Sequence, residues 1–492
     1  MRQKTKKQNP TSTPKINIVS LIVFTIMVLI ASMVTFWLFY RQCVESMLET
    51  GRYHSDMKAY ILEMQGLDSG YSFPYPILFK LAAAIHLVTS SLDTGAELAM
   101  ALATMLLNSA AMIALKIMLD RHVGTWLQQS RSAGDTDTRR QKTMSEKAVD
   151  DAHERPSMPD GFADARNQQS VTGNSVGTSW KNNSSSGQGL TSILISVVAV
   201  SLFFVSMVYP PTGIYLPGIQ YKYLGVFTPN PFHNATYMAA RPFAILAFFK
   251  YGELLPLYEQ KNAWKEHTWD YVLFSLYLLL ATMAKPSFTI VLVGVAGLLM
   301  LWRLFRSRFQ NFLPTLWLGV CFLPTFIDLL YQFRGVFVPQ EGQEGGIGVT
   351  FGNVWMQYCS NIPLAIGLAI GFPLLVLLLN YKDLKKDSIY RFSWQIYVMS
   401  FLMAFGLYEK GFREMDFNFA WGYMYGIFFA FIGAMLVLLR ATAEAVETAK
   451  TASKVQIRRN YGVIGIQWLA YLWHLVCGLY YFWGFLQGAM YY

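Results

Sequence analysis

The chain has 492 residues, of which 53% are hydrophobic, 15% aromatic and only 14% charged, and its formal net charge is +10. Soluble globular proteins contain about 25% charged residues, so this composition excludes an ordinary soluble enzyme, a disordered protein and a basic nucleic-acid-binding protein. The four cysteines form neither a disulfide framework nor a CxxC metal pattern. Composition therefore predicts an all-α polytopic membrane protein.

Apolar runs of about 20 residues, long enough to cross a membrane, recur along the chain. The first, 18–40, follows a basic start containing Arg2 and Lys4 and ends in Trp37 and Tyr40, as an uncleaved anchor does. The later runs are 95–118, 190–208, 237–258, 269–284, 286–304, 311–331, 362–380, 392–408, 418–440 and 462–485. We therefore predict about eleven transmembrane helices.

A shorter apolar stretch runs from Pro76 to Val88 and contains Lys80 and His86. Stretches of about 10–14 residues are more often interfacial than spanning, so we predict a juxtamembrane helix in the first outer loop. With this stretch outside the membrane and the N-terminus in the cytoplasm, the inner segments hold 28 of the 40 Lys and Arg residues. That distribution follows the positive-inside rule and predicts a multi-pass protein of the cell membrane.

These assignments divide the chain into four parts. Residues 1–17 form a cytoplasmic tail, and residues 18–118 hold the first span, an outer catalytic loop with the juxtamembrane helix, and the second span. Residues 119–189 are rich in Ser, Asn, Gln, Asp and Arg, so we expect a disordered cytoplasmic loop. Residues 190–492 supply the remaining transmembrane helices and outer loops.

The first outer loop contains an acidic residue shortly after the first span, in the stretch Tyr53-His54-Ser55-Asp56-Met57-Lys58-Ala59-Tyr60. A carboxylate just outside the bilayer can take a proton from an incoming nucleophile, so Asp56 is a candidate general base. The competing interpretation is a solvated or helix-capping aspartate. Glu63 and Asp68, further along this loop, are weaker candidates for a second acid.

Basic residues in the outer loops are candidates for binding an anion. His233 and Arg241 flank the start of the span at 237–258 and suit a phosphate at the membrane surface, with interfacial anchoring and snorkelling as the alternative. Lys285 lies in a Lys-Pro-Ser turn where the proline ends the preceding helix. The late outer segment 408–419 adds Lys410 and Arg413 among aromatic residues. Its acids are further secondary candidates: Glu409, Glu414 and Asp416.

The sequence motifs of several common enzymes and transporters are absent. The sequence contains no Walker loop, HExxH motif or paired CxxC, which argues against an ATP-driven pump and a tightly held zinc ion. We predict neither a metal nor a cofactor. Charged residues are scarce in the middle of the predicted spans, so chemistry at the outer surface fits better than transport.

The order of these features resembles the GT-C superfamily of integral membrane glycosyltransferases. The resemblance lies in the anchor, the early outer-loop Asp56, the aromatic-proline helix after Phe73-Pro74-Tyr75-Pro76 and the Lys285 turn. It implies a sugar taken from a polyprenyl-phosphate donor, with a first-loop acid as general base. The chain lacks both a large soluble outer domain and the Trp-Trp-Asp signature of oligosaccharyltransferases, so a lipid-linked or surface-polymer acceptor is expected.

With this resemblance, we expect a hexosyl- or pentosyltransferase in which Asp56 deprotonates an acceptor hydroxyl. Polyprenyl phosphate then leaves, its charge held by some of His233, Arg241, Lys285, Lys410 and Arg413. The expected partners are a polyprenyl-phosphate-linked sugar, a glycan or lipid acceptor and membrane lipids, without nucleic acid. Two alternatives remain: a polysaccharide polymerase or ligase that uses lipid-linked substrates, and a transporter of lipid-linked sugars or solutes.

Overall fold

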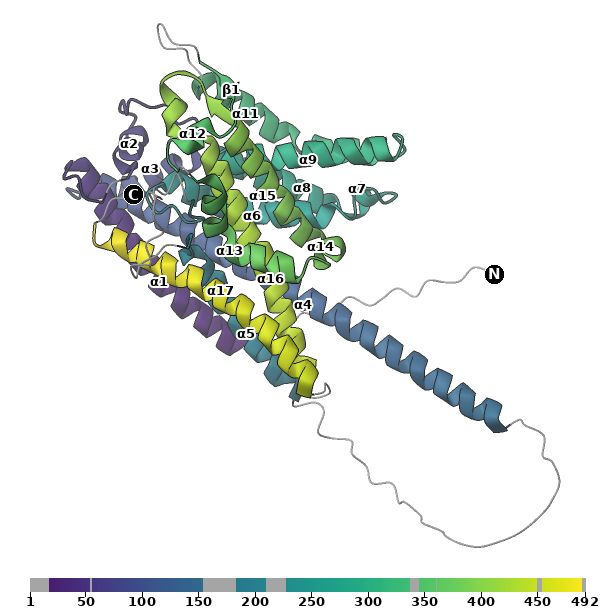
Figure 1. Ribbon diagram of the computed structural model, residues 1–492. Coiled ribbons are helices and arrows are strands. Elements are labelled where there is room, and N and C mark those ends of the chain that lie inside the picture. The colour runs from purple at the N-terminus through teal and green to yellow at the C-terminus, as the bar shows by residue number, and fades with distance from the viewer. Residues whose placement is uncertain are drawn as a thin grey trace, which may run out of the picture.

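The computed structural model describes residues 17–53, 55–153, 183–208, 227–336, 345–359, 361–448 and 454–488. These residues form a bundle of helices with one small two-stranded antiparallel sheet (Figure 1). The long elements are α1 (Ile18–Met47), α4 (Gly95–His153), α5 (Asn183–Ser201), α6 (Ala235–Leu254), α8 (Thr268–Ala284), α9 (Ser287–Arg306), α10 (Phe312–Val320), α11 (Leu323–Val336), α13 (Ile362–Leu379), α15 (Ser388–Gly406), α16 (Phe419–Thr448) and α17 (Lys454–Leu486).

Short elements connect the long ones. They are α2 (Met57–Met64), α3 (Ile77–Thr89), η1 (Leu202–Phe204), α7 (Ala263–Glu266), β1 (Ile347–Val349), α12 (Asn353–Met356), α14 (Asp383–Lys386), β2 (Leu407–Glu409) and η2 (Gly411–Asp416). Strands β1 and β2 are antiparallel, with Ile347 opposite Glu409 and Val349 opposite Leu407. This sheet fixes the start of the late charged segment against residues about sixty positions earlier in the chain.

Each predicted apolar run falls on a helix, and 311–331 falls on α10 and α11, which are bent by 50°. Among the described residues, six helices are long and apolar enough to cross a membrane, and the bent pair would make a seventh. They are α1, α4 as far as Gln128, α9, α13, α16 and α17. The other predicted runs lie on α5, α6, α8 and α15. A helical architecture with several helices long and apolar enough to span a membrane is therefore confirmed, and the count of about eleven stays a prediction.

Helix α16 is the centre of the bundle. Its whole apolar window is buried, and α15, α13, α9, α4, α5 and α17 pack around it (Figure 1). Contact with α15 is close because glycines face serines: a Cβ on Gly426 would lie 1.9 Å from Ser400 Oγ, and one on Gly433 would lie 2.1 Å from Ser393 Oγ. Small residues of this kind let helices approach closely where lipid offers no hydrophobic driving force.

Helix α13 is broken near its middle, and a histidine satisfies the break. Pro373 crowds the carbonyl four residues before it, and Ile370 leaves the helical region with φ −122° and ψ 22°. The freed N–H of Phe372 donates to His474 Nε2 at 3.1 Å, while His474 Nδ1 lies 2.7 Å from the carbonyl oxygen of Ser206. His474 is therefore a structural residue, with both ring nitrogens bound to backbone groups.

Two sequence predictions can be compared with the structure here: the juxtamembrane helix and the disordered loop. The predicted juxtamembrane stretch is the helix α3, with Leu87 and Val88 highly exposed at its end. The disorder predicted from residue 119 is wrong for residues 119–153, because α4 continues without a break to His153 (Figure 1). These residues contain no proline and many good helix formers, which lets the helix propagate. It is also wrong for residues 183–189, which begin α5, and the part of that predicted loop from 154 to 182 lies outside the described residues.

Candidate functional site

Asp56 lies at the start of α2, at one end of the bundle. It occupies the N-cap position, but its side chain makes no capping hydrogen bond. Instead its Oδ2 accepts from Asn234 Nδ2 at 2.9 Å and from the hydroxyl of Tyr60 at 3.1 Å. Its backbone N–H points to the carbonyl oxygen of His233 at 3.5 Å. The exposed carboxylate is thus joined to the segment that precedes α6, far away in the sequence.

Asn234 connects this carboxylate to a buried cation. Asparagine is a preferred N-cap residue, and Asn234 Oδ1 accepts from the backbone N–H of Tyr237 at 2.9 Å to begin α6. The same oxygen accepts from Thr236 Oγ1 at 2.9 Å and from Lys285 Nζ at 3.1 Å. One amide therefore places a lysine ammonium on one side and the Asp56 carboxylate on the other.

Lys285 lies in the turn between α8 and α9 and is only 6% exposed. Its Nζ donates to Thr236 Oγ1 at 3.0 Å and lies 4.7 Å from the ring centre of Trp421, which presents the electron-rich face of an indole. Burial lowers the pKa of Lys285 to about 7, with Asp56 opposing the shift and Arg413 adding to it. The Lys285 amine is therefore partly protonated near neutral pH, and its protonated form can bind an anion.

Aromatic residues of the first loop form a wall beside Asp56. The ring of Tyr60 lies edge-on to Phe73 at 5.2 Å and tilted against Phe79 at 6.0 Å. Burial raises the pKa of the Tyr75 hydroxyl, while the charge of Arg413 opposes that shift. Arg413 affects the pKa of both Tyr75 and Lys285, so the first loop, the Lys285 turn and the late segment converge on one place.

The late charged segment borders this place and is held by its own ion pairs. Arg413 Nε lies 3.4 Å from a Glu409 oxygen and 3.3 Å from an Asp416 oxygen. Burial raises the pKa of the Glu409 carboxyl, and Arg413 opposes that shift. Lys410 follows β2 and is exposed, as is Glu414 in η2. Of the residues predicted in this segment, Arg413 and Glu409 are partly buried, and the others are exposed.

Arg241 does not belong to this group of contacts. Its guanidinium is completely buried, donates to Asn230 Oδ1 and, at 2.8 Å, to Asn108 Oδ1, and lies 4.8 Å from the ring centre of Phe203. Neutral amides and an aromatic ring thus surround a cation in the interior. Residue 241 was predicted as a phosphate ligand, but the contacts place it inside the bundle, where it joins α4 to α6.

His233 and the remaining acids take different positions. The His233 ring is buried, 5.8 Å from Trp421 and 6.4 Å from Phe485, so its imidazole packs among aromatic rings beside the Asp56 contact. Glu63 lies half-buried on α2, and burial raises the pKa of its carboxyl. Asp68 is exposed and accepts from the N–H of Gly70 at 2.9 Å, which makes it a turn residue.

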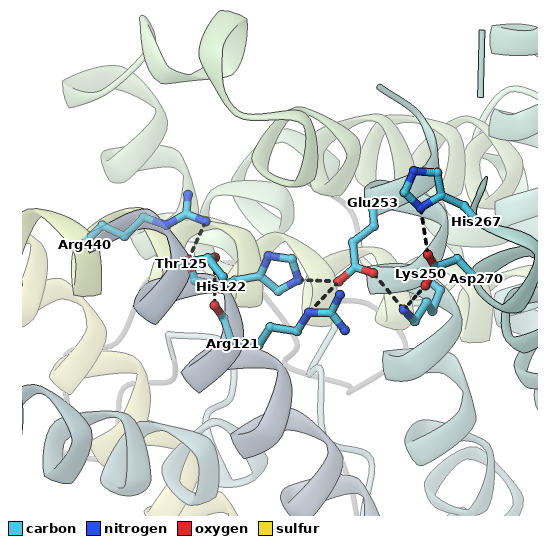
Figure 2. A network of polar contacts seen from close by, with 8 residues as sticks. All are labelled: Arg121, His122, Thr125, Lys250, Glu253, His267, Asp270 and Arg440. Carbon is cyan, nitrogen blue, oxygen red and sulfur yellow. Dashed lines mark hydrogen bonds and ion pairs between the residues drawn. The ribbon is translucent and has the colours of Figure 1, made fainter. Parts of the chain in front are cut away.

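A second group of charged residues lies at the other end of α6 (Figure 2). Glu253 contacts Lys250 at 3.0 Å, His122 at 3.1 Å and Arg121 at 3.4 Å. Lys250 continues the chain of contacts to Asp270 at 2.6 Å. We call Arg121, His122, Lys250, Glu253, His267 and Asp270 the Glu253 cluster. A cavity of about 760 Å³ lies beside it, and Asp387 and Arg440 also line this cavity.

This second group is better explained as a connection between helices than as a reactive site. Each carboxylate at its centre faces at least one cation, and Asp387 is paired with Arg440 in the same way. These pairs join α4, α6, α8, α15 and α16. Within the part of the chain that the structure describes, no group of three His, Cys, Asp or Glu side chains could hold a metal ion, here or around Asp56.

Sequence reasoning identified the charged residues of the Asp56 site but missed the neutral ones. Asn234, Thr236, Tyr60 and Trp421 make the contacts that join Asp56 to Lys285. A signal existed for Asn234, because asparagine directly before an apolar helical run is a typical N-cap. The other three have no pattern that separates them from ordinary packing residues.

The comparisons with known proteins give no relative. The chain matches no protein-family model, no curated protein and no solved structure. Function must therefore be argued from the geometry of the site itself.

Proposed function

We propose that the chain is a membrane glycosyltransferase that moves a sugar from a polyprenyl-phosphate donor to an acceptor hydroxyl. One observation carries the proposal: a single amide, that of Asn234, joins the exposed Asp56 carboxylate to the buried Lys285 ammonium. Such an arrangement offers a proton acceptor and an anion-binding cation a few ångströms apart, at one end of an apolar bundle. The order of features that resembles the GT-C superfamily supports the same reaction class.

In the proposed reaction Asp56 takes the proton of the acceptor hydroxyl as that oxygen attacks the anomeric carbon. The bond between this carbon and the phosphate oxygen breaks, and polyprenyl phosphate leaves with the electron pair. Lys285 stabilises the departing negative charge from a partly desolvated position, where an ion pair is stronger than in water. Arg413 borders the same place and adds positive charge, and Lys410, exposed in the same segment, stays a candidate for a further contact with the phosphate. Attack opposite the leaving group inverts the anomeric configuration.

The topology in this proposal follows the distribution of basic residues. The Asp56 end faces away from the cytoplasm, with the N-terminus inside and the Glu253 cluster on the inner side. Apolar helix surfaces such as those of α1 and α17 then contact lipid, and the polyprenyl chain approaches from that phase. A glycan or lipid acceptor reaches Asp56 from the opposite, aqueous side.

Replacement of Asp56 tests the proposal directly. The change Asp56→Asn keeps the size of the side chain but removes the base, so sugar transfer should fall at least about 100-fold, within the range that general bases contribute. The assay supplies radiolabelled polyprenyl-phosphate sugars to the purified protein in detergent or liposomes. An exposed acid in a turn, Asp68→Asn, is the matched control and should leave transfer unchanged. Normal turnover by the Asp56→Asn protein contradicts the assignment.

A further inference from the structure

Asn234 has only one possible orientation of its side-chain amide. Its Oδ1 accepts from the backbone N–H of Tyr237 and from Lys285 Nζ, and when protonated neither of these groups can accept a hydrogen bond. The oxygen must therefore face them, so Nδ2 must face Asp56, 2.9 Å from Oδ2. The hydroxyl of Tyr60 donates to the same oxygen at 3.1 Å. The ionised form of Asp56 is the form that both donors favour.

We propose that Asn234 is the positioning residue of this site: it holds the Asp56 carboxylate in a fixed orientation, and it holds Lys285 at a fixed place opposite. The role rests on the proposed function. Asn234 touches neither substrate nor reacting atoms, and it acts through the two charged residues. Without it, the carboxylate loses a hydrogen-bond donor that fixes its orientation, and the cation loses one of its two hydrogen-bond acceptors.

Asn234 also begins α6, so a test must separate capping from positioning. The change Asn234→Asp keeps the capping oxygen and the acceptor for Lys285, but it replaces the N–H donor with a second carboxylate oxygen facing Asp56. Two carboxylates at this distance share a proton at low pH and repel each other when both are ionised. The stability of Asn234→Asp relative to wild type should therefore fall as pH rises from about 5 to 8.

The double variant Asp56→Asn with Asn234→Asp exchanges the two groups. It restores one amide donor facing one carboxylate, so its thermal stability should recover and lose the part of the pH dependence that comes from two facing carboxylates. Sugar transfer should stay at least tenfold below wild type in both variants, because the base has moved or is held protonated. In the single variant the acid limb of the transfer rate should move to higher pH. Asn361→Asp, at the N-cap of α13, where the side-chain oxygen accepts from the N–H of Leu364, should show neither effect.

The experiment measures thermal unfolding of the full-length chain in detergent at several pH values, followed by sugar transfer from polyprenyl-phosphate donors. A stability difference for Asn234→Asp that does not change with pH, or a double variant no more stable than the single one, would overturn the role of Asn234. Thermal unfolding needs no substrate. Failure of the wild type to transfer any sugar would therefore overturn the proposed function separately from the contact.

Discussion

Lys285 carries a charge in a place where charge is costly. An ammonium ion taken out of water must recover its hydration energy from hydrogen bonds and nearby charges. Here it has two acceptors, Asn234 and Thr236, and the face of Trp421. These contacts recover only part of the cost, and burial accordingly lowers the pKa of Lys285 to about 7. An anionic ligand would supply the missing counter-charge.

Binding of a lipid phosphate should depend on pH through this lysine. Because the amine is charged below its pKa of about 7 and neutral above it, affinity for polyprenyl phosphate should weaken as pH rises from 7 to 9, by up to about tenfold per unit. Lys285→Met should bind weakly, with this pH dependence lost. Lys80→Met, an exposed lysine on α3, is the control and should behave like wild type. Binding measured by thermophoresis checks this, and unchanged affinity in Lys285→Met would contradict it.

The sequence predicts the charged members of the site better than their partners. Asp56 was singled out as a carboxylate just outside the first span, and Lys285 as a lysine in an outer turn, because charges at the membrane surface can meet a substrate. Arg241 satisfied the same criterion, yet its guanidinium binds Asn108 and Asn230 in the interior. Whether a basic residue faces a ligand or a buried amide depends on which helices meet, and that is a tertiary property. Asn108 is the only asparagine in the predicted run 95–118, and nothing else in the neighbouring sequence indicated that it would bind Arg241.

At the scale of elements, the contact between α15 and α16 shows how small residues determine how closely two helices pack. Gly426 and Gly433 are seven positions apart, and so are Ser393 and Ser400 opposite them, so each pair repeats after two helical turns. Each serine hydroxyl also donates to a carbonyl of its own helix, three residues earlier, which removes its need for a partner. The two helices can thus touch without leaving a polar group unsatisfied.

A methyl group at this contact should separate the helices. Gly426→Ala places a Cβ 1.9 Å from Ser400 Oγ, so we expect a loss of about 1–3 kcal/mol in stability, as for other overpacked cores. Gly297→Ala, in α9, meets no atom within 4 Å and should be neutral or stabilising by up to about 1 kcal/mol. Thermal unfolding of both proteins in detergent provides the measurement. Equal effects of the two changes would show that the close contact is absent.

Helix positions could be predicted from sequence more fully than helix ends. Long apolar runs identify elements such as α1 and α16, because only a helix satisfies its own backbone in lipid. The break in α13 follows from Pro373, but its repair by His474 does not, since the two residues are a hundred positions apart. The continuation of α4 beyond residue 118 was also missed, because polarity was equated with disorder.

At the scale of the whole molecule, charged groups gather at the two ends of the same helices. Asn234 and Glu253 lie 19 residues apart on α6, which corresponds to roughly 28 Å at the rise of an α-helix. Trp421 and Arg440 lie the same distance apart on α16, and no charged residue separates them. The hydrocarbon core of a bilayer is about 30 Å thick. The Asp56 site and the Glu253 cluster therefore fit the two membrane surfaces.

The Glu253 cluster should stabilise the bundle by joining its helices at one surface. Glu253→Gln removes the charge that Arg121, His122 and Lys250 share, and we expect a loss of about 2 kcal/mol, between the values for exposed and buried pairs. Glu259→Gln, which breaks the more exposed pair with Arg303, should cost less than about 1 kcal/mol. Thermal unfolding in detergent distinguishes them. A Glu253→Gln protein as stable as the control would argue that the cluster is solvated rather than structural.

The central place of α16 has a consequence for how the protein is made. Five of the helices that pack on it, α4, α5, α9, α13 and α15, are synthesised before residue 419, and α17 is synthesised after it. The earlier helices can enter the membrane one by one, but these five share no common partner until residues 419–448 have been made. Biogenesis must therefore hold the inserted helices without this shared contact until α16 arrives, and a nascent chain that stops earlier leaves their α16-facing surfaces uncovered.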